Sequence, residues 1–125
     1  MTAASAELQI SCALREYLNA IYQLSVSRHA VRITDISNHM GISKPSVNRA
    51  VNALKRAGLV SHEPYGCIYL TEKGTEEGML FMERSKTVSG FLAKALDLPQ
   101  ETADSAAVKI ASELSDDIIE KMKIY

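Results

Sequence analysis

Gly41, Ser43 and Pro45 lie within five residues of one another, between two segments whose apolar side chains recur at helical spacing. Glycine readily adopts the left-handed conformation that ends a helix, serine caps a helix start, and proline is tolerated in the first turn. The sequence therefore predicts a helix that ends at Gly41 and a second helix that begins at Ser43. Two helices joined by such a short turn are typical of a helix-turn-helix.

The first of these helices is short, and Thr34 is its expected N-cap, because a threonine hydroxyl can accept a hydrogen bond from an unpaired backbone N–H. Ile33, Ile36 and Met40 are its apolar side chains, and we expect them to face a core. The second helix has Val47, Val51 and Leu54 at spacings of four and three residues, so these side chains share one face, and Gly58 ends it.

Two short strand-like runs follow directly, at residues 59–62 and 67–70. The residues between them include Pro64 and Gly66, which are typical of turns because proline fixes one φ and glycine allows a positive one. A two-stranded hairpin directly after a helix-turn-helix predicts the wing of a winged helix.

Helical spacing continues on both sides of this unit. Residues 8–25 predict an amphipathic helix with one apolar face: Ile10, Leu14, Tyr17, Ile21 and Leu24. Downstream, Thr71 is expected to cap a helix that Gly74 and Gly78 weaken, and residues 97–99 are expected to break the helical pattern. The last segment is expected to be helical with one apolar side: Ala103, Ala106, Ala107, Ile110, Leu114, Ile118 and Met122.

The predicted fold is mainly α with a small β-hairpin, and it divides at residue 71. Residues 1–71 form a winged helix-turn-helix DNA-binding domain, and residues 72–125 form a helical dimerisation region. The second region has more apolar side chains than one short helical appendage can bury: Phe91, Leu92, Ile110, Leu114 and Ile118. An exposed apolar patch usually finds a partner, and a two-fold pair is the commonest solution, so we expect a homodimer.

Charge is unevenly distributed along a chain whose overall net charge is only −1. Residues 28–60 contain six basic side chains and one acid, Asp35, which is a net charge of +5. Residues 61–125 contain seven basic and twelve acidic side chains. A basic block in an otherwise acidic chain indicates a polyanion as the partner of that block.

The exposed face of the second helix carries side chains that suit DNA. An arginine such as Arg49 can pair with guanine O6 and N7, and the amides of Asn48 and Asn52 can pair with adenine N6 and N7. The hydroxyls and backbone N–H groups at the helix start suit phosphate oxygens. The candidate DNA-binding residues are Ser43, Lys44, Pro45, Ser46, Asn48, Arg49 and Asn52, with Tyr65 in the wing.

Other functional classes have little support. The sequence has no nucleophile motif, no glycine-rich phosphate loop and no paired histidines at helical spacing, so an enzyme is not expected. Cys12 and Cys67 are far apart and belong to no C-x-x-C pair, which favours free thiols in a reducing compartment. Without a signal peptide or a membrane-length apolar run, a cytoplasmic protein with no membrane contact is expected.

The chain resembles the diphtheria-toxin-repressor and manganese-repressor family (DtxR/MntR-like) of metal-dependent transcriptional regulators. The resemblance is carried by Glu16-Tyr17-Leu18-x-x-Ile21-Tyr22, by Ile36-Ser37-x-x-Met40-x-Ile42-Ser43-x-Pro45-Ser46-Val47, and by Gly58-Leu59-Val60 and Leu70-Thr71-x-Lys73-Gly74 around the wing. Phe91-Leu92 and Leu114-Ser115-Asp116 resemble the dimerisation helices. The resemblance implies a dimeric repressor that binds a palindromic operator on double-stranded DNA, with Mn²⁺ or Fe²⁺ as the cofactor.

The implied metal site departs from the family pattern. Glu16 matches one ligand position, but the other positions hold Asn19, Ser85, Val108, Ala111 and Ser112. Divalent transition metals need several nitrogen, sulfur or carboxylate donors, so most of the family's ligands are missing and no cofactor is expected.

Two alternatives remain open at this stage. One is a metal-responsive repressor with non-standard ligands: Glu16, Cys12, Glu83 and Glu113. The other is a winged helix used as a protein-interaction module, which the basic face with Lys44 and Arg49 disfavours.

Overall fold

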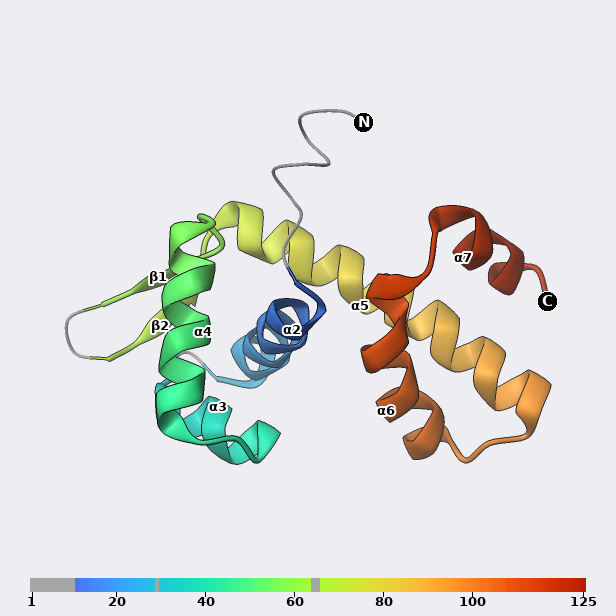
Figure 1. The fold of residues 1–125 in the computed structure, drawn as a ribbon, viewed down its shortest axis with the longest axis horizontal. Helices are drawn as coiled ribbons and strands as arrows, with labels where there is room; N and C mark the ends of the chain where they lie inside the picture. Colours follow the sequence, from blue (N-terminus) through green and yellow to red (C-terminus); the bar gives the residue numbers. More distant parts are fainter. Residues whose placement is uncertain (1–10, 29, 64–65) are drawn as a thin grey trace.

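The structure is a computed structural model, and it describes residues 11–28, 30–63 and 66–125. The elements are α2 (Cys12–Ser27), α3 (Ile33–Met40), α4 (Lys44–Arg56), β1 (Val60–His62), β2 (Ile68–Leu70), α5 (Glu72–Leu96), α6 (Gln100–Ile110), the 3₁₀ turn η1 (Ala111–Glu113) and α7 (Asp116–Lys123). The expected class, mainly α with a small hairpin, is confirmed. Figure 1 shows α5 as a long helix that joins a winged-helix unit to a second unit containing α6 and α7.

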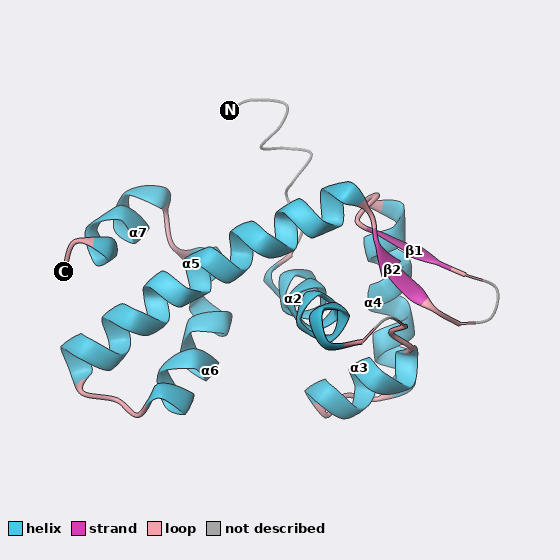
Figure 2. Cartoon of the chain, turned by 180° about the vertical axis from the view of Figure 1, so that it is seen from behind, coloured by secondary structure: helices cyan, strands magenta, loops and turns pink. Residues whose placement is uncertain are grey.

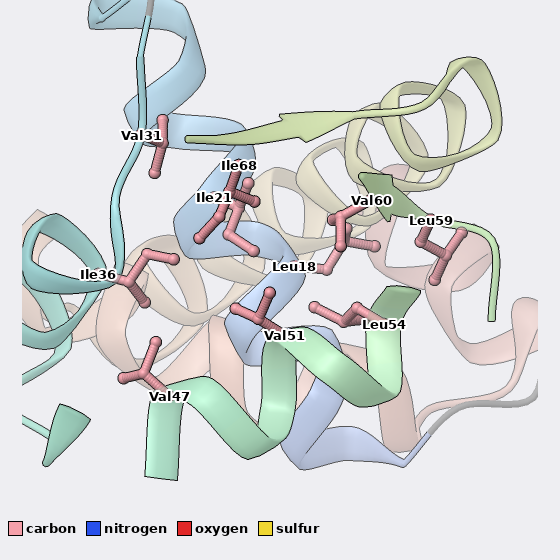
Figure 3. Close-up of a cluster of buried hydrophobic side chains, with 10 residues drawn as sticks. All are labelled: Leu18, Ile21, Val31, Ile36, Val47, Val51, Leu54, Leu59, Val60 and Ile68. Carbon is pink, nitrogen blue, oxygen red and sulfur yellow. The ribbon is translucent and has the colours of Figure 1, made fainter. Parts of the chain in front are cut away.

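The winged-helix unit has its own apolar core, which α2, α3, α4 and the hairpin enclose. The strands β1 and β2 pair antiparallel, with Ser61 opposite Tyr69. Inward-facing side chains meet in the middle (Figure 3): Leu18, Ile21, Val31, Ile36, Val47, Val51, Leu54, Leu59, Val60 and Ile68. The predicted core positions of α4 are therefore confirmed, because all three are fully buried.

The residues that end α3 and start α4 also take the predicted positions. Gly41 ends α3 with a φ of 67°, in the left-handed region. Ser43 is the N-cap of α4 and accepts a hydrogen bond from the backbone N–H of Ser46 at 3.3 Å. Pro45 lies in the first turn of α4, where its missing N–H leaves no hydrogen bond unmade.

One predicted helix start is wrong. Thr34 lies inside α3, which begins at Ile33, because the Asp35 carboxylate accepts the backbone N–H of Arg32 at 2.9 Å and fixes the helix start there. Of the helix predicted over residues 8–25, residues 8–10 lie outside the described residues. The helix α2 begins at Cys12, and the Ser11 hydroxyl caps it by accepting the N–H of Leu14.

Gly74 and Gly78, one turn apart on the same face of α5, allow neighbouring elements to pack closely against it. A Cβ atom on Gly74 would lie 1.9 Å from the carbonyl oxygen of Leu59, and one on Gly78 would lie 2.6 Å from the Tyr22 ring. The helix continues unbroken to Leu96 and packs its second half against α6 and α7 (Figure 2). This region has a second core: Phe81, Val88, Ala107, Ala111 and Ile119.

The last segment is not one helix with a single apolar side. It breaks at Leu114 and Ser115, where a new N-cap starts α7. The Arg84 guanidinium donates to the carbonyl oxygens of Ala111 and Leu114, and these carbonyls are then satisfied outside a helix. As a consequence, Ile118 is partly exposed and its neighbour Ile119 is buried.

Candidate nucleic-acid interface

The outer face of α4 is a polar and cationic surface on a rigid support. The inner face of α4 is anchored in the core, so the side chains between the buried positions must point outward. Lys44, Asn48, Arg49 and Asn52 are all exposed. The structure thus brings the predicted α4 residues together on one side of the winged-helix unit.

Hydrogen bonds join three of these predicted residues along the first turns of α4. The Ser43 hydroxyl donates to the Ser46 hydroxyl at 2.9 Å, and Arg49 Nη2 donates to Ser46 Oγ at 3.2 Å. Ser46 therefore positions the arginine as well as lying at the helix start. This contact reduces the number of orientations that the Arg49 guanidinium can adopt.

The cations of this face are not neutralised by the protein itself. Among the residues that the structure describes, no carboxylate forms an ion pair with Lys44, Lys55 or Arg56. In contrast, Arg28 pairs with Asp35 at 2.7 Å on the other side of α3. The unpaired ammonium and guanidinium groups leave a local positive potential that an anion can neutralise.

The wing presents a side chain that sequence reasoning missed. Tyr69 of β2 is exposed, and its hydrogen bond with Cys67 raises the pKa of the phenol, so Tyr69 stays neutral and able to donate. Tyr69 lies opposite Ser61 on the outer face of the hairpin. Successive side chains of a strand point to opposite faces, so burial of the neighbouring Ile68 places Tyr69 outside, and this alternation is visible in the sequence. Tyr65, the predicted wing residue, lies outside the described residues.

The donors at the family's metal position do not fit a divalent transition metal. Glu16 faces Lys109, with 3.6 Å between the carboxylate and ammonium groups, and Asn19 is buried beside Val108 in the same region. Cys12 Sγ lies 2.8 Å from Glu113 Oε1, so two of the non-standard metal ligands considered from the sequence are neighbours. Even so, no three His, Cys, Asp or Glu residues within the described ranges are grouped closely enough to hold a metal.

Both thiols are free in the structure. None of the described helices is both long and apolar enough to span a bilayer.

Known proteins match both the sequence and the arrangement of elements. A family profile described as "Iron dependent repressor, N-terminal DNA binding domain" matches residues 10–68. An HTH-type transcriptional regulator of Methanocaldococcus jannaschii is 34% identical over 117 residues, which cover 93% of this chain and 94% of that protein. The chain belongs to the iron-dependent repressor family. The resemblance to the DtxR/MntR-like regulators is therefore confirmed, and the chain is a DNA-binding transcriptional regulator of this family.

More distant members of the iron-dependent repressor family match over part of their length. The transcriptional regulator MntR of Listeria welshimeri is 29% identical over 80 residues, 64% of this chain and 56% of that protein. A manganese-dependent transcriptional repressor, solved in complex with manganese, superimposes with a TM-score of 0.80 at 20% identity, over 89% of this chain and 51% of that one. The chain spans about half the length of these two proteins.

Proposed function

We propose that this iron-dependent repressor homologue reads double-stranded DNA by placing the first half of α4 in the major groove. The observation that carries the proposal is the outer face of α4, where Arg49, Asn48 and Asn52 are exposed. The same helix carries Lys44, Lys55 and Arg56, which form no ion pair with any described residue. The recognition helix of a helix-turn-helix contacts base edges with its N-terminal residues. Ser43 and Ser46 lie at that end of α4, and Lys55 and Arg56 lie at the other end.

Base-edge and backbone contacts are assigned to different residues of α4. Arg49 is held by Ser46 and carries a planar fork of donors, so we assign it to a guanine. Lys44, Lys55 and Arg56 are cations at the two ends of the helix, and we assign them to phosphates, which fix the register of the protein on the duplex. Under this proposal the molecule binds DNA and performs no enzymatic step.

Arg49→Ala is expected to weaken binding to the selected operator by about 1–3 kcal/mol and to relax base preference at one position of each half-site. The reason is that alanine removes a bidentate contact to a base edge. The measurement is a selection of random duplexes followed by affinity titration of the best and mismatched sites.

Lys55→Ala is the matched control for this measurement. It removes one positive charge from the same helix, so it should weaken all duplexes by a similar factor and leave base preference unchanged. If Arg49→Ala kept the wild-type base preference, the assignment of Arg49 to a base would be wrong.

We propose that the region after Thr71 forms a homodimer, which would place two copies of α4 on a palindromic operator as a repressor does. Leu92 and Leu114 were expected at this interface, but they pack against the second core of their own chain. Exposed apolar side chains of this region include Met79 and Leu80 of α5, Ile110 of α6 and Ile118 of α7. An open groove of about 730 Å³ lies between α5 and α7. We therefore propose that residues 1–71 bind DNA and that residues 72–125 form the dimer.

Leu80→Asp is expected to shift the protein from dimer to monomer, because each protomer would then bury an unpaired carboxylate in the proposed interface. Sedimentation equilibrium at micromolar concentration measures the change from twice 13.7 kDa to 13.7 kDa. Val26→Asp is the matched control, since Val26 is an exposed apolar side chain on α2. A wild-type protein that sediments as a monomer would contradict the proposal.

We also propose that DNA binding does not depend on Mn²⁺ or Fe²⁺. Glu16 is the single carboxylate at the family's metal position, and the ammonium group of Lys109 already lies beside it. The neighbouring position holds the amide of Asn19 beside the apolar Val108. His39 also lines this cavity, but within the described ranges no three His, Cys, Asp or Glu residues are grouped closely enough to hold a metal. This donor set offers one charged ligand where a transition metal needs several.

A further inference from the structure

A cavity of about 250 Å³ lies where α2, α5 and α6 meet. Its walls include Asn19 and Gln23 from α2, Ser85 from α5, and Asp104 and Val108 from α6. A water molecule occupies about 30 Å³ of liquid, so the cavity exceeds the volume of one or two waters and approaches that of a small-molecule site. A second cavity of about 320 Å³ shares Asn19, Gln23 and Val108 with it and reaches Met40 at the end of α3.

Two polar groups in the wall of the cavity make no hydrogen bond with any described residue. Asn19 is only 6% exposed, and its side-chain amide has no such bond. The Ser85 hydroxyl oxygen is fully buried and lacks a partner within the described ranges. A buried polar atom without a partner is costly, and a ligand that forms a hydrogen bond with the Ser85 hydroxyl removes this cost.

The cavity is also lined by one positive and one negative side chain, Lys86 and Asp104, which are both exposed to solvent. Among the described residues, neither Lys86 nor Asp104 forms an ion pair. The Asp104 carboxylate accepts hydrogen bonds from Ser89 at 2.5 Å and Gln100 at 2.9 Å, and these bonds lower its pKa. The carboxylate is therefore charged at neutral pH and lacks a cation.

We propose that this cavity binds a small zwitterionic organic molecule of the size of a free α-amino acid. The ligand's ammonium group would pair with Asp104 and its carboxylate with Lys86. The Asn19 amide and the Ser85 hydroxyl would then hydrogen-bond the polar atoms between these charges. Val108 and the apolar part of Met82 form the wall against which a short side chain would pack.

The position of the cavity gives such a ligand access to both units of the molecule. Asn19 belongs to a helix that packs in the winged-helix core, whereas Ser85 and Asp104 belong to the second unit. A molecule bound between them would fix the orientation of one unit relative to the other. Control of operator affinity by this ligand rests on the proposed DNA-binding function, but binding of the ligand does not.

The test is thermal denaturation of the whole chain without DNA, in the presence of each of the twenty standard L-amino acids at 10 mM, or at saturation for the sparingly soluble tyrosine. At least one is expected to raise Tm by about 5 °C, as follows from a Kd near 1 mM. Asp104→Asn and Ser85→Ala should lose this shift. Ser85→Ala removes an unpartnered hydroxyl, so its Tm without ligand should equal or exceed that of the wild type.

Glu101→Gln is the matched control, since it removes an exposed acidic charge from the same helix and should keep the shift. The proposal is overturned if no amino acid moves Tm by more than about 1 °C, or if both cavity variants keep the full shift. It is also overturned if MnCl₂ alone produces the shift that Asp104→Asn removes. Arg49→Ala, which tests DNA reading, should leave the amino-acid response unchanged, so the two proposals fail separately.

Discussion

Gly74→Ala is expected to destabilise the fold by about 3 kcal/mol, the upper range for overpacking in a tightly packed contact. The added Cβ would lie 1.9 Å from the carbonyl oxygen of Leu59 and 2.9 Å from its carbonyl carbon. These are backbone atoms of a buried residue, and the same carbonyl accepts the N–H of Thr71 at 3.1 Å. Relief of the clash therefore requires α5 to move away from the wing, which breaks the start of the helix.

The sign of this effect is diagnostic, because glycine to alanine in an open helix is normally stabilising by about 1 kcal/mol. Gly90→Ala is the matched control in the same helix, since nothing lies within 4 Å of its added Cβ. Urea denaturation followed by circular dichroism should show a lower midpoint for Gly74→Ala and a higher one for Gly90→Ala. Equal stability of Gly74→Ala and the wild type would contradict the close approach of α5 to the wing.

DNA affinity is expected to fall about 1,000-fold between 50 and 200 mM salt. Lys44, Lys55 and Arg56 supply three phosphate contacts in each protomer, so a dimer on a palindrome makes six. Each neutralised phosphate releases counterions, and the slope of log K against log salt is about −0.9 per contact, or about −5 for the complex. Fluorescence anisotropy with a labelled duplex measures the slope.

Single variants measure how much each cation contributes to the salt dependence of DNA binding. Arg56→Ala removes one contact from each protomer and should reduce the slope by about 2. Lys121→Ala, an exposed cation of α7 far along the chain from α4, should leave it unchanged.

The same titration with 1 mM MnCl₂ should overlay the metal-free curve. A flat salt response would oppose DNA binding through α4, and a tenfold gain with manganese would oppose the proposed metal independence.

The sequence alone predicted the parts of this molecule that short-range chemistry specifies. Gly41, Ser43 and Pro45 act on their own backbone and immediate neighbours, so the ends of α3 and α4 could be placed from residue type. Helical spacing predicted the buried face of α4, and the other positions of this helix were then expected to form its outer face. The family resemblance was also available, because its motifs are local runs.

Contacts between distant residues decided the rest. Gly74 looks like a helix breaker until Leu59 is seen against it, and Ser115 starts a new helix where Arg84 binds the preceding carbonyl groups. In the sequence, Asn19 only stands at a position where the family has a metal ligand, whereas packing of α2 against α5 and α6 buries it at a cavity. Hydrogen-bond patterns within a helix depend on sequence neighbours, whereas space around a side chain depends on which helices meet there, and only the tertiary structure determines that.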